Sequence, residues 1–592
     1  MASTNTIDPD SRSVTLRDCA WLLVACIVVL WLGLGTTRLW DQDEGYYASV
    51  AREMFDRQDW VVPTFNSELF AHKPPMMFWG MLVGFHFFGV GEFAARWASA
   101  FFGTGMILLT YFLGRLLIDR KAGLIAAVVL VSSLMFTVVS RSATADVHLG
   151  FFILLAITLW VHDAKKSFQG EHHPPMDFPV TRLRTWIAFY FSISLAVLSK
   201  GPIGFAFPIA ILGTLTLAWP WISGQSTSWI QCLSPKRFFQ AALSMRPFAG
   251  AVVLMFVAAP WFWMVNTRTE GAFFQEFFGV QHIERFSKPM DNHSGPVYYY
   301  LLATLIGFFP WTSFAIPIAL HTWNQTRQSS NRLGWSVVLV WLFFYFVVFS
   351  LASTKLPNYI IPAYPAVALA IARYSSGWFG IQTTESVPMG SLWRQAGWAF
   401  MIFSGLLVGG ITLTLATRFG QPWLAELQID PKLIPCLVNF SWLGVLLLTC
   451  GVLGLVLHRL HRSESGIYVM GGLGVAWVSL LWQLIIPSID RFQTPQKIAS
   501  EFIAPSGTAA VGREPAIVGM FRPSMVFYAK QSLDFCQDDQ GLEKVLSEKS
   551  PSLVVINQSS KEAQRLLDEH GYRLSESLDS FPKRGSISVY RR

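Results

Sequence analysis

The stretch Met76-Met77-Phe78-Trp79-Gly80-Met81-Leu82-Val83-Gly84-Phe85-His86-Phe87-Phe88-Gly89-Val90 decides the fold, because it determines how often the chain can cross a membrane. As a helix it is roughly 22 Å long at about 1.5 Å per residue, short of the ~30 Å apolar core of a bilayer. Three glycines interrupt it, and His86 lies within it. These features predict a re-entrant or interfacial helix rather than a membrane span.

The rest of the chain is strongly apolar. Hydrophobic residues make up 52% of the 592 residues and charged residues only 14%. A soluble protein of this length needs more surface charge, so the composition predicts an α-helical polytopic membrane protein. Thirteen apolar runs are long enough to cross: 19–37, 92–118, 121–140, 147–163, 184–199, 201–222, 247–266, 297–320, 335–352, 358–374, 396–416, 434–457 and 467–488.

Thirteen spans place most loop cations on one side of the membrane. These cations are Arg115, Arg120, Lys121, Lys165, Lys166, Lys236, Arg237, Arg327, Arg332, Arg394, His458 and Arg462. By the positive-inside rule that side is the cytoplasm, so the N-terminus lies inside and the C-terminus outside. The net charge of +8 therefore fits membrane topology, and nucleic-acid binding is not expected. We expect a multi-pass membrane protein whose unusual loops lie on the extracytoplasmic side.

The composition changes after residue 488, which predicts two domains, a membrane domain over 1–488 and an extracytoplasmic α/β domain over 489–592. In the second domain the apolar patterns favour strands and helices in alternation. The expected strands are 516–520, 532–535, 553–557 and 586–590, and the expected helices are 523–530, 541–549 and 561–570. No Gly-rich phosphate loop occurs there, so this domain is expected to be a lid or partner surface.

The first outer loop, 38–91, combines acids with a fixed lysine. Asp41, Asp43 and Glu44 follow the first span directly, and His72-Lys73-Pro74-Pro75 comes later in the same loop. A carboxylate at the membrane edge is costly unless it is hydrated, paired or used in chemistry. It could act as a general base or simply begin a helix. The prolines fix the backbone beside Lys73, which could bind a lipid phosphate or snorkel to the interface.

Other outer loops hold further polar side chains. Arg141 and Asp146 close a short turn in which they could form a mutual salt bridge, and Lys355 and Tyr359 lie in a turn containing Pro357. The loop between the spans 247–266 and 297–320 adds three more candidates, His282, Arg285 and His293. Carboxylates beside phosphate-binding cations suit sugar transfer from a polyprenyl phosphate, because the departing lipid phosphate needs positive charge.

Several motifs in order resemble the GT-C glycosyltransferases, in the bacterial branch with lipid A aminoarabinose transferase and relatives of protein O-mannosyltransferases. They are Asp43-Glu44-Gly45-Tyr46-Tyr47-Ala48, Lys73-Pro74-Pro75, Gly91-Glu92-Phe93-Ala94-Ala95-Arg96, Arg141 with Asp146, Leu198-Ser199-Lys200-Gly201-Pro202, His282-Ile283-Glu284-Arg285-Phe286, Gly307-Phe308-Phe309-Pro310-Trp311 and Lys355-Leu356-Pro357-Asn358-Tyr359. The resemblance implies a GT-C fold and an inverting transfer on the outer face of the membrane.

The resemblance also implies roles for single residues. Asp43 matches the catalytic acid and Asp146 a second outer-loop acid, while Lys73, Arg285 and Tyr359 match residues that hold the lipid phosphate. From the loops themselves we add Glu44 to the catalytic acids and Lys355 to the phosphate-binding residues. Further substrate-binding candidates are Asp41, His72, Arg141, His282 and His293. Asp41 stays a rival to Asp43. His72 stands where relatives often have Glu, and Gly45-Tyr46 replaces their usual Thr-Arg.

These patterns predict a glycosyltransferase whose partners are a polyprenyl-phosphate-linked sugar, membrane lipids and an acceptor that is a lipid, a protein or a glycan. The alternative functions are a transporter or flippase for lipid or sugar, and a non-catalytic sensor. Transporters place charges near the middle of the membrane, whereas here the charges cluster in the outer loops. No metal site is predicted, although a divalent cation near Asp43 or His72 stays open.

Overall fold

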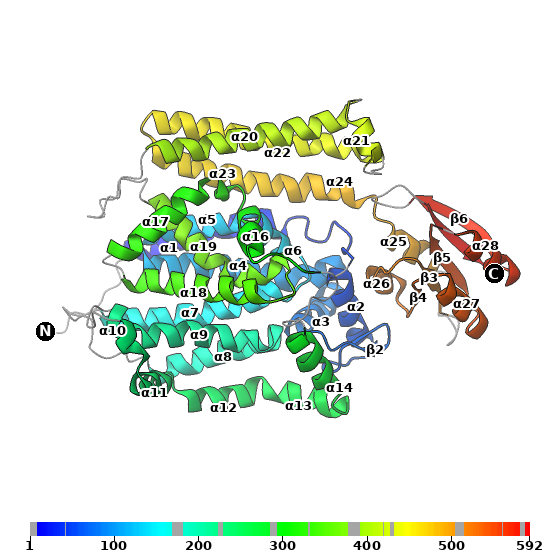
Figure 1. Cartoon of the computed structure of the whole chain (residues 1–592), viewed down its shortest axis with the longest axis horizontal. Coiled ribbons are helices and arrows are strands. Elements are labelled where there is room, and N and C mark those ends of the chain that lie inside the picture. The colour runs from blue at the N-terminus through cyan, green and yellow to red at the C-terminus, as the bar shows by residue number, and fades with distance from the viewer. Residues whose placement is uncertain are drawn as a thin grey trace.

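The structure, a computed structural model, is predominantly helical (Figure 1). It describes residues 9–41, 43–168, 182–222, 229–284, 293–328, 332–376, 391–417, 419–426, 431–503, 514–558, 560–579 and 586–592. Most long helices run side by side across Figure 1, and the C-terminal domain lies at one end of this bundle.

Long apolar helices form the bundle. They are α1 (Pro9–Cys26, continued by η1, Ile27–Trp31), α4 (Glu92–Leu117), α5 (Arg120–Val131), α6 (Leu134–Arg141), α7 (Asp146–Phe168), α8 (Leu183–Lys200), α9 (Ile203–Leu217), α12 (Pro247–Val257), α13 (Ala259–Arg268), α16 (Tyr299–Gly307), α17 (Ala315–Gln328), α18 (Arg332–Leu351), α19 (Tyr364–Ser376), α20 (Ser391–Ala416), α22 (Ile434–Arg459) and α23 (Ser463–Leu480, continued by η8, Leu481–Ile485, and α24, Ile486–Asp490).

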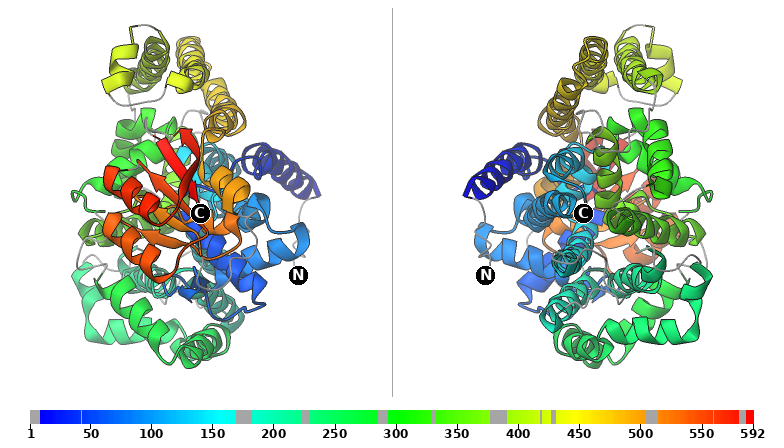
Figure 2. Two further views of the ribbon diagram at one scale, coloured as in Figure 1. Left: turned by 90° about the vertical axis from the view of Figure 1, so that its right-hand side faces the viewer. Right: turned by 90° about the vertical axis from the view of Figure 1, so that its left-hand side faces the viewer.

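Shorter elements connect these helices. They are α10 (Trp219–Ile222), η2 (Trp229–Leu233), α11 (Pro235–Ser244), α14 (Ala272–Phe274), η3 (Gln275–Glu284), η4 (Trp311–Phe314), η5 (Pro357–Ala363), α21 (Gln421–Glu426) and η7 (Pro431–Leu433). Figures 1 and 2 show α20 and α22 as a pair at one side of the bundle, next to α23.

The helices confirm a polytopic membrane protein. Within the described residues, seven helices are long and apolar enough to cross a membrane, and the number rises to ten if each of three bent pairs is one span. Every one of the thirteen predicted runs coincides with one or more helices. The helices α8, α9 and α19 fall outside the seven and the three pairs, so thirteen crossings stays a prediction.

The stretch after Lys73 forms a short helix, α3 (Met76–Phe88). Its 13 residues give a length of roughly 20 Å, which is less than the thickness of the bilayer core. It packs against α4 and against α2 (Asp43–Asp56), the helix that begins with the first-loop acids. Between α2 and α3 lies a small hairpin of β1 (Thr64–Phe65) and β2 (Glu68–Leu69). The interfacial position of α3 stays a prediction that its length supports.

The C-terminal domain is built around a five-stranded sheet in the order β4-β3-β5-β7-β6. The strands β3 (Ala516–Val518), β4 (Asp534–Cys536) and β5 (Leu553–Asn557) are parallel, and β7 (Ser586–Arg591) pairs antiparallel with β5. Three predicted helices are present as α26 (Ser524–Ala529), α27 (Asp539–Glu548) and α28 (Lys561–Glu569). The sequence analysis missed the edge strand β6 (Arg573–Asp579), because it is polar and mostly exposed on both faces.

The two faces of this sheet contact different parts of the molecule. One face packs with α27 and α28, through Val518, Ile556, Leu546 and Leu567. The other face joins a single apolar core with α26, α2 and α3, whose members include Ile517, Val555, Phe527, Ala51 and Phe78. Figure 2 shows the C-terminal domain in front of the bundle end. The predicted boundary near residue 488 therefore does not divide the hydrophobic core.

Candidate active site

The acids of the first outer loop lie at the start of α2, in different surroundings. Asp43 is the first residue of the helix and its side chain is exposed. Among the residues that the structure describes, none donates a hydrogen bond to the Asp43 carboxylate or forms an ion pair with it. Positions i and i+4 share a helix face, so Asp43 lies one turn above Tyr47. The Tyr47 ring in turn lies 6.0 Å from Lys73 Nζ.

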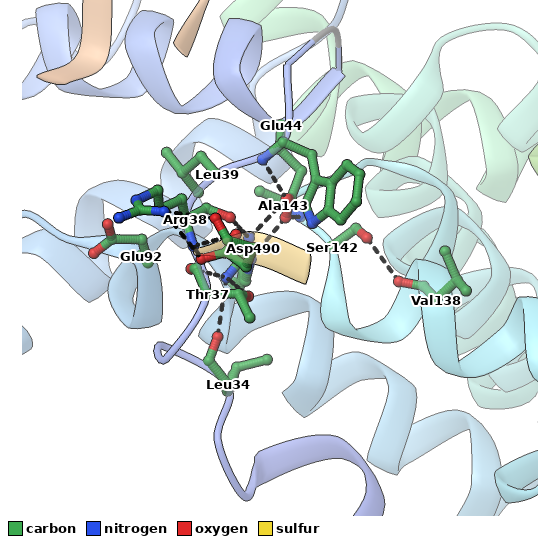
Figure 3. Close-up of polar contacts among 12 residues, drawn as sticks. Leu34, Thr37, Arg38, Leu39, Glu44, Glu92, Val138, Ser142, Ala143 and Asp490 are labelled. Carbon is green, nitrogen blue, oxygen red and sulfur yellow. Dashed lines mark hydrogen bonds and ion pairs between the residues drawn. The ribbon is translucent and has the colours of Figure 1, made fainter. Parts of the chain in front are cut away.

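Glu44 forms a buried ion pair with Arg96 of α4. The two side chains are only 5% and 3% exposed, and Arg96 Nε and Nη2 each donate to one carboxylate oxygen at 2.8 Å. Glu44 also accepts from the backbone N–H of Ala143, in the loop before Asp146, at 2.9 Å. The rest of the Arg96 guanidinium donates to the carbonyls of residues 34, 37 and 38. Figure 3 shows Glu44 reaching Ala143, with Thr37 and Arg38 close by.

Asp41 is bound to the C-terminal domain. Its Oδ2 lies 3.1 Å from Arg522 Nη1, and its Oδ1 accepts from the N–H of Ser524 at 3.2 Å and from the Ser524 hydroxyl. Both carboxylate oxygens of this rival to Asp43 are therefore occupied by protein donors. Asp41 therefore ties the turn to the C-terminal domain and Glu44 ties it to α4, while Asp43 between them in sequence is exposed.

Asp146 begins α7 and is buried. It forms an ion pair with Lys200 at the end of α8, and its other oxygen accepts from Asn358 Nδ2 at 2.9 Å. The alternative of a mutual salt bridge with Arg141 is wrong. Arg141 instead donates to the carbonyls of Val29 and Leu32, and its guanidinium lies 4.9 Å from the Trp482 ring. These carbonyls belong to the π-helical end of the first span, so Arg141 satisfies groups that the helix leaves unpaired.

A cavity of about 150 Å³ opens beside this ion pair. Two ammonium groups line it, those of Lys73 and Lys200, and the Lys200 ammonium lies 4.4 Å from the Tyr359 ring. A cation over an aromatic face is stabilised by the ring's electron density. The other lining residues are His72, Leu149, Ile203, Phe207, Phe277, Gln281, His282, Val348, Phe349, Ala352 and Thr354. The cavity thus combines positive charge with an extended apolar wall.

The histidines at this cavity are held by neighbouring groups. His282 Nδ1 contacts the carbonyl oxygen of Phe277 at 2.6 Å, and the ring packs edge-on against the Phe277 ring. Burial lowers the pKa of His282, and the nearby charges of Lys73 and Lys200 act in the same direction. The His72 ring packs against the Phe70 ring at a tilt of 42°, with ring centroids 4.4 Å apart. A neutral His282 can donate or accept a hydrogen bond without adding charge.

Lys355 and His293 do not line the cavity. The Lys355 ammonium donates to the carbonyls of Phe349, Ser350 and Ala352 at the end of α18, and burial lowers its pKa. It caps that helix rather than facing a ligand. The His293 carbonyl accepts from Lys355 N–H at 2.9 Å, which places His293 beside the cap. Arg285 lies outside the described residues.

Sequence reasoning assigned no role to three residues that build this site. Lys200 and Asn358 both contact Asp146, and Arg96 carries the pair with Glu44. Lys200 and Asn358 lie in outer turns closed by Gly or Pro, a signal that could have included them. Arg96 ends the 91–96 motif of the family resemblance, but the motif alone did not indicate its partner. Within the described ranges, no group of three or more His, Cys, Asp or Glu side chains could hold a metal ion.

Comparisons with known proteins show which proteins the chain resembles. A family model described as dolichyl-phosphate-mannose-protein mannosyltransferase matches residues 19–272. An undecaprenyl phosphate-alpha-4-amino-4-deoxy-L-arabinose arabinosyl transferase of Erwinia tasmaniensis is 30% identical over 468 residues, covering 78% of this chain and 75% of that protein. An uncharacterized protein of Aquifex aeolicus is 29% identical over 562 residues, 94% of each chain.

A solved structure has the same fold. The crystal structure of ArnT from Cupriavidus metallidurans bound to undecaprenyl phosphate has a TM-score of 0.71 at 21% identity, covering 96% of this chain and 97% of that one. The predicted fold class, a helical membrane protein of the GT-C type with a small C-terminal α/β region, is thereby confirmed. With the 30% identity to the Erwinia enzyme over most of both chains, the chain belongs to the aminoarabinose transferase family of GT-C membrane glycosyltransferases.

Proposed function

We propose that the cavity holds the phosphate of a polyprenyl-phosphate sugar and that Asp43 is the base for its transfer. An acceptor oxygen attacks the anomeric carbon as its proton passes to Asp43. The bond from that carbon to the phosphate oxygen breaks, and polyprenyl phosphate leaves with the electron pair. The leaving group gains negative charge, which the ammonium groups of Lys73 and Lys200 stabilise. Attack opposite the leaving group inverts the anomeric centre.

The cavity lining carries this proposal. Its polar part has Lys73, Lys200 and His282, and its apolar part has Ile203, Phe207, Val348 and Phe349 from α9 and α18. A lipid phosphate has the same division, an anionic head followed by a hydrocarbon chain. A free nucleotide sugar would gain little from the apolar side, so the lining favours a lipid-linked donor.

The environments of the acids support the choice of Asp43. A base must have a lone pair within reach of the acceptor, so its carboxylate oxygens must be open to the acceptor rather than occupied by protein donors. Protein donors occupy Asp41, Glu44 and Asp146. The Asp43 carboxylate is exposed one helical turn from Tyr47, whose ring lies 6.0 Å from Lys73 Nζ. In this proposal Asp146 holds Lys200, and Glu44 and Asp41 hold the turn.

We place this site and the C-terminal domain outside the cytoplasm of a bacterial inner membrane. The contacts of Asp41, Glu44 and Asp146 bring four predicted outer segments to one end of the bundle: the first loop, the 141–146 turn, the 353–359 turn and the C-terminal domain. Since those segments share an end, the positive-inside assignment is consistent along the chain. The acceptor is a lipid, a protein or a glycan presented on that face.

Purified protein in lipid nanodiscs tests the proposal. Undecaprenyl-phosphate 4-amino-4-deoxy-L-arabinose is the first donor to supply, since the Erwinia relative is named for that sugar. We expect release of polyprenyl phosphate that depends on an added acceptor, with lipid A, peptide and glycan assayed in turn. Asp43→Asn should lower the rate roughly 10²–10⁴-fold, the usual contribution of a general base. Glu68→Gln, an exposed carboxylate of the same loop, is the matched control and should retain full rate.

The lysines are tested by donor binding. A hydrogen bond to a charged group contributes about 1.5–3 kcal/mol, so Lys73→Met should weaken polyprenyl-phosphate binding roughly 10–100-fold. Lys561→Met removes an exposed lysine of α28 as the control. If Lys73→Met and the wild-type protein bind polyprenyl phosphate equally well, the cavity is not the donor site.

A further inference from the structure

The helix α26 of the C-terminal domain lies along α2. The Ser49 hydroxyl donates to the Pro523 carbonyl at 3.1 Å, and Arg52 Nη1 donates to the Phe527 carbonyl at 2.8 Å. The Arg52 guanidinium also lies 5.5 Å from the Phe527 ring. Side chains of α2 therefore reach both ends of α26, so the two helices are fixed relative to each other.

One residue of α26 contacts the acid turn on both sides of Asp43. Ser524 donates through its N–H and its hydroxyl to Asp41, two residues before Asp43. It also packs directly on Gly45, two residues after Asp43. A Cβ added to Gly45 would lie 2.6 Å from Ser524 N and 2.8 Å from its Cα, so only glycine permits this approach. Gly45 N–H donates to the Trp40 carbonyl at 2.8 Å, which closes the turn.

Further contacts hold the C-terminal domain in place relative to the turn that carries Asp43. Tyr528 accepts from Leu39 N–H at 2.8 Å and donates to Glu92 of α4 at 3.0 Å. Arg38 N–H donates to Asp490, the last residue of α24, at 3.1 Å. One face of the domain's sheet also shares its hydrophobic core with α2 and α3. These contacts therefore fix the position of Ser524 relative to α2 and α4.

We propose that the C-terminal domain positions the base of the transfer reaction, with Ser524 holding the Asp43 turn through Asp41 and against Gly45. The idea rests on the proposed function of Asp43. Asp41, Gly45 and Ser524 are positioning residues, because Asp41 and Gly45 contact Ser524 and act only through the turn that carries Asp43. A displacement of about 1 Å in a reacting group can cost roughly 10²-fold in rate. Loosening this contact should therefore lower kcat, while donor binding by Lys73 and Lys200 is retained.

The first test is Gly45→Ala. The new methyl group must push Ser524 and the turn apart, because the atoms it meets are backbone. We expect kcat to fall at least 10-fold with the Kd for undecaprenyl phosphate within 2-fold of the wild-type value. Gly472→Ala in α23, whose added Cβ would have no neighbour within 4 Å, is the matched control and should leave both quantities unchanged. A wild-type kcat in folded Gly45→Ala would overturn the proposal, as would an equal loss of kcat and donor binding.

The second test restores the contact covalently. In the double variant Asp41→Cys/Ser524→Cys, a disulfide joins the two positions whose side chains now hydrogen-bond. We expect low kcat in the reduced protein and recovery to within about 3-fold of wild type after oxidation, with the cross-link verified by peptide mass spectrometry. Recovery would also exclude Asp41 as the base, since no carboxylate is left at that position.

Three outcomes would overturn the proposal: full activity of the reduced variant, inactivity of the cross-linked variant, or failure of the two thiols to join. Failure of the proposed function is separable from these. It would appear as wild-type protein without acceptor-dependent release of polyprenyl phosphate, or as full activity of Asp43→Asn. Thermal unfolding of each variant identifies any that has simply failed to fold.

Discussion

Asp43 and Asp146 each begin a helix at the same end of the bundle, but their carboxylates are in opposite situations. Asp146 is buried, with one oxygen on Lys200 and the other on Asn358, all within the membrane bundle. Asp43 is exposed, without a partner among the described residues, on a turn that the C-terminal domain holds. An engaged carboxylate organises its surroundings, and a free one can take a proton. The comparison separates the acid that builds the site from the acid that reacts.

The sharpest way to break this comparison is to neutralise each acid in turn. Asp43→Asn should lower kcat roughly 10²–10⁴-fold without changing stability. Asp146→Asn leaves the mostly buried Lys200 unpaired, and loss of one partner of a buried pair costs about 3–5 kcal/mol. The empty Asp146→Asn protein should therefore unfold at a lower temperature. Added undecaprenyl phosphate should raise the unfolding temperature of Asp146→Asn by more than it raises that of the wild type, because the bound anion now pairs with Lys200.

Calorimetry or a thermal-shift assay with and without the lipid phosphate measures this difference. Identical stability profiles for the two variants would show that the two acids do not have distinct roles. Glu68→Gln again serves as the neutral reference on the same face of the molecule.

Arg96→Met removes the connection between the two regions. Arg96 holds Glu44, and Glu44 in turn accepts from Ala143 in the loop before Asp146. Breaking this buried pair leaves a charge uncompensated, so we expect roughly 3–5 kcal/mol of destabilisation and reduced yield of folded protein. Arg394→Met, on the predicted cytoplasmic side, is a control for loss of one arginine. A wild-type unfolding temperature for Arg96→Met would contradict the structural role of the pair.

The sequence predicted the membrane helices better than the pairing of side chains. Runs such as 92–118 and 147–163 correspond to Glu92–Leu117 and Asp146–Phe168, because apolar length alone marks a spanning helix. Asp43, Lys73 and Tyr359 could be proposed because they follow a motif in outer loops. The Glu44–Arg96 pair joins residues 52 positions apart, and no local pattern reports such a contact.

Lys355 illustrates the same limit at a single side chain. The sequence placed its ammonium in the right loop, but an ammonium can bind a phosphate or cap helix carbonyls equally well. Only the path of the chain after α18 determines that it reaches the carbonyls of Phe349, Ser350 and Ala352.

Lys355→Met therefore separates structural from ligand-binding cations. Its three carbonyl partners would lose a charged donor, and we expect about 1–3 kcal/mol of destabilisation with no change in the Kd for undecaprenyl phosphate. Lys200→Met, in contrast, should raise the Kd for undecaprenyl phosphate roughly 10-fold or more. Weaker binding of undecaprenyl phosphate by Lys355→Met would show instead that Lys355 contributes to donor binding.

The smallest expected effect is the pH dependence that His282 adds to the region around the cavity. Burial lowers its pKa, so the folded protein keeps the ring neutral where the unfolded chain, at about 6.5, already binds a proton. Stability contributed by the neutral ring is therefore present at higher pH and lost as the pH falls through about 6.5. His282→Gln should flatten the decline in unfolding temperature between about pH 7.5 and 5.5, by under ~1.4 kcal/mol per pH unit. His570→Gln, in the C-terminal domain, is the control. A decline as steep in His282→Gln as in that control would show that the protonation of His282 is not coupled to folding.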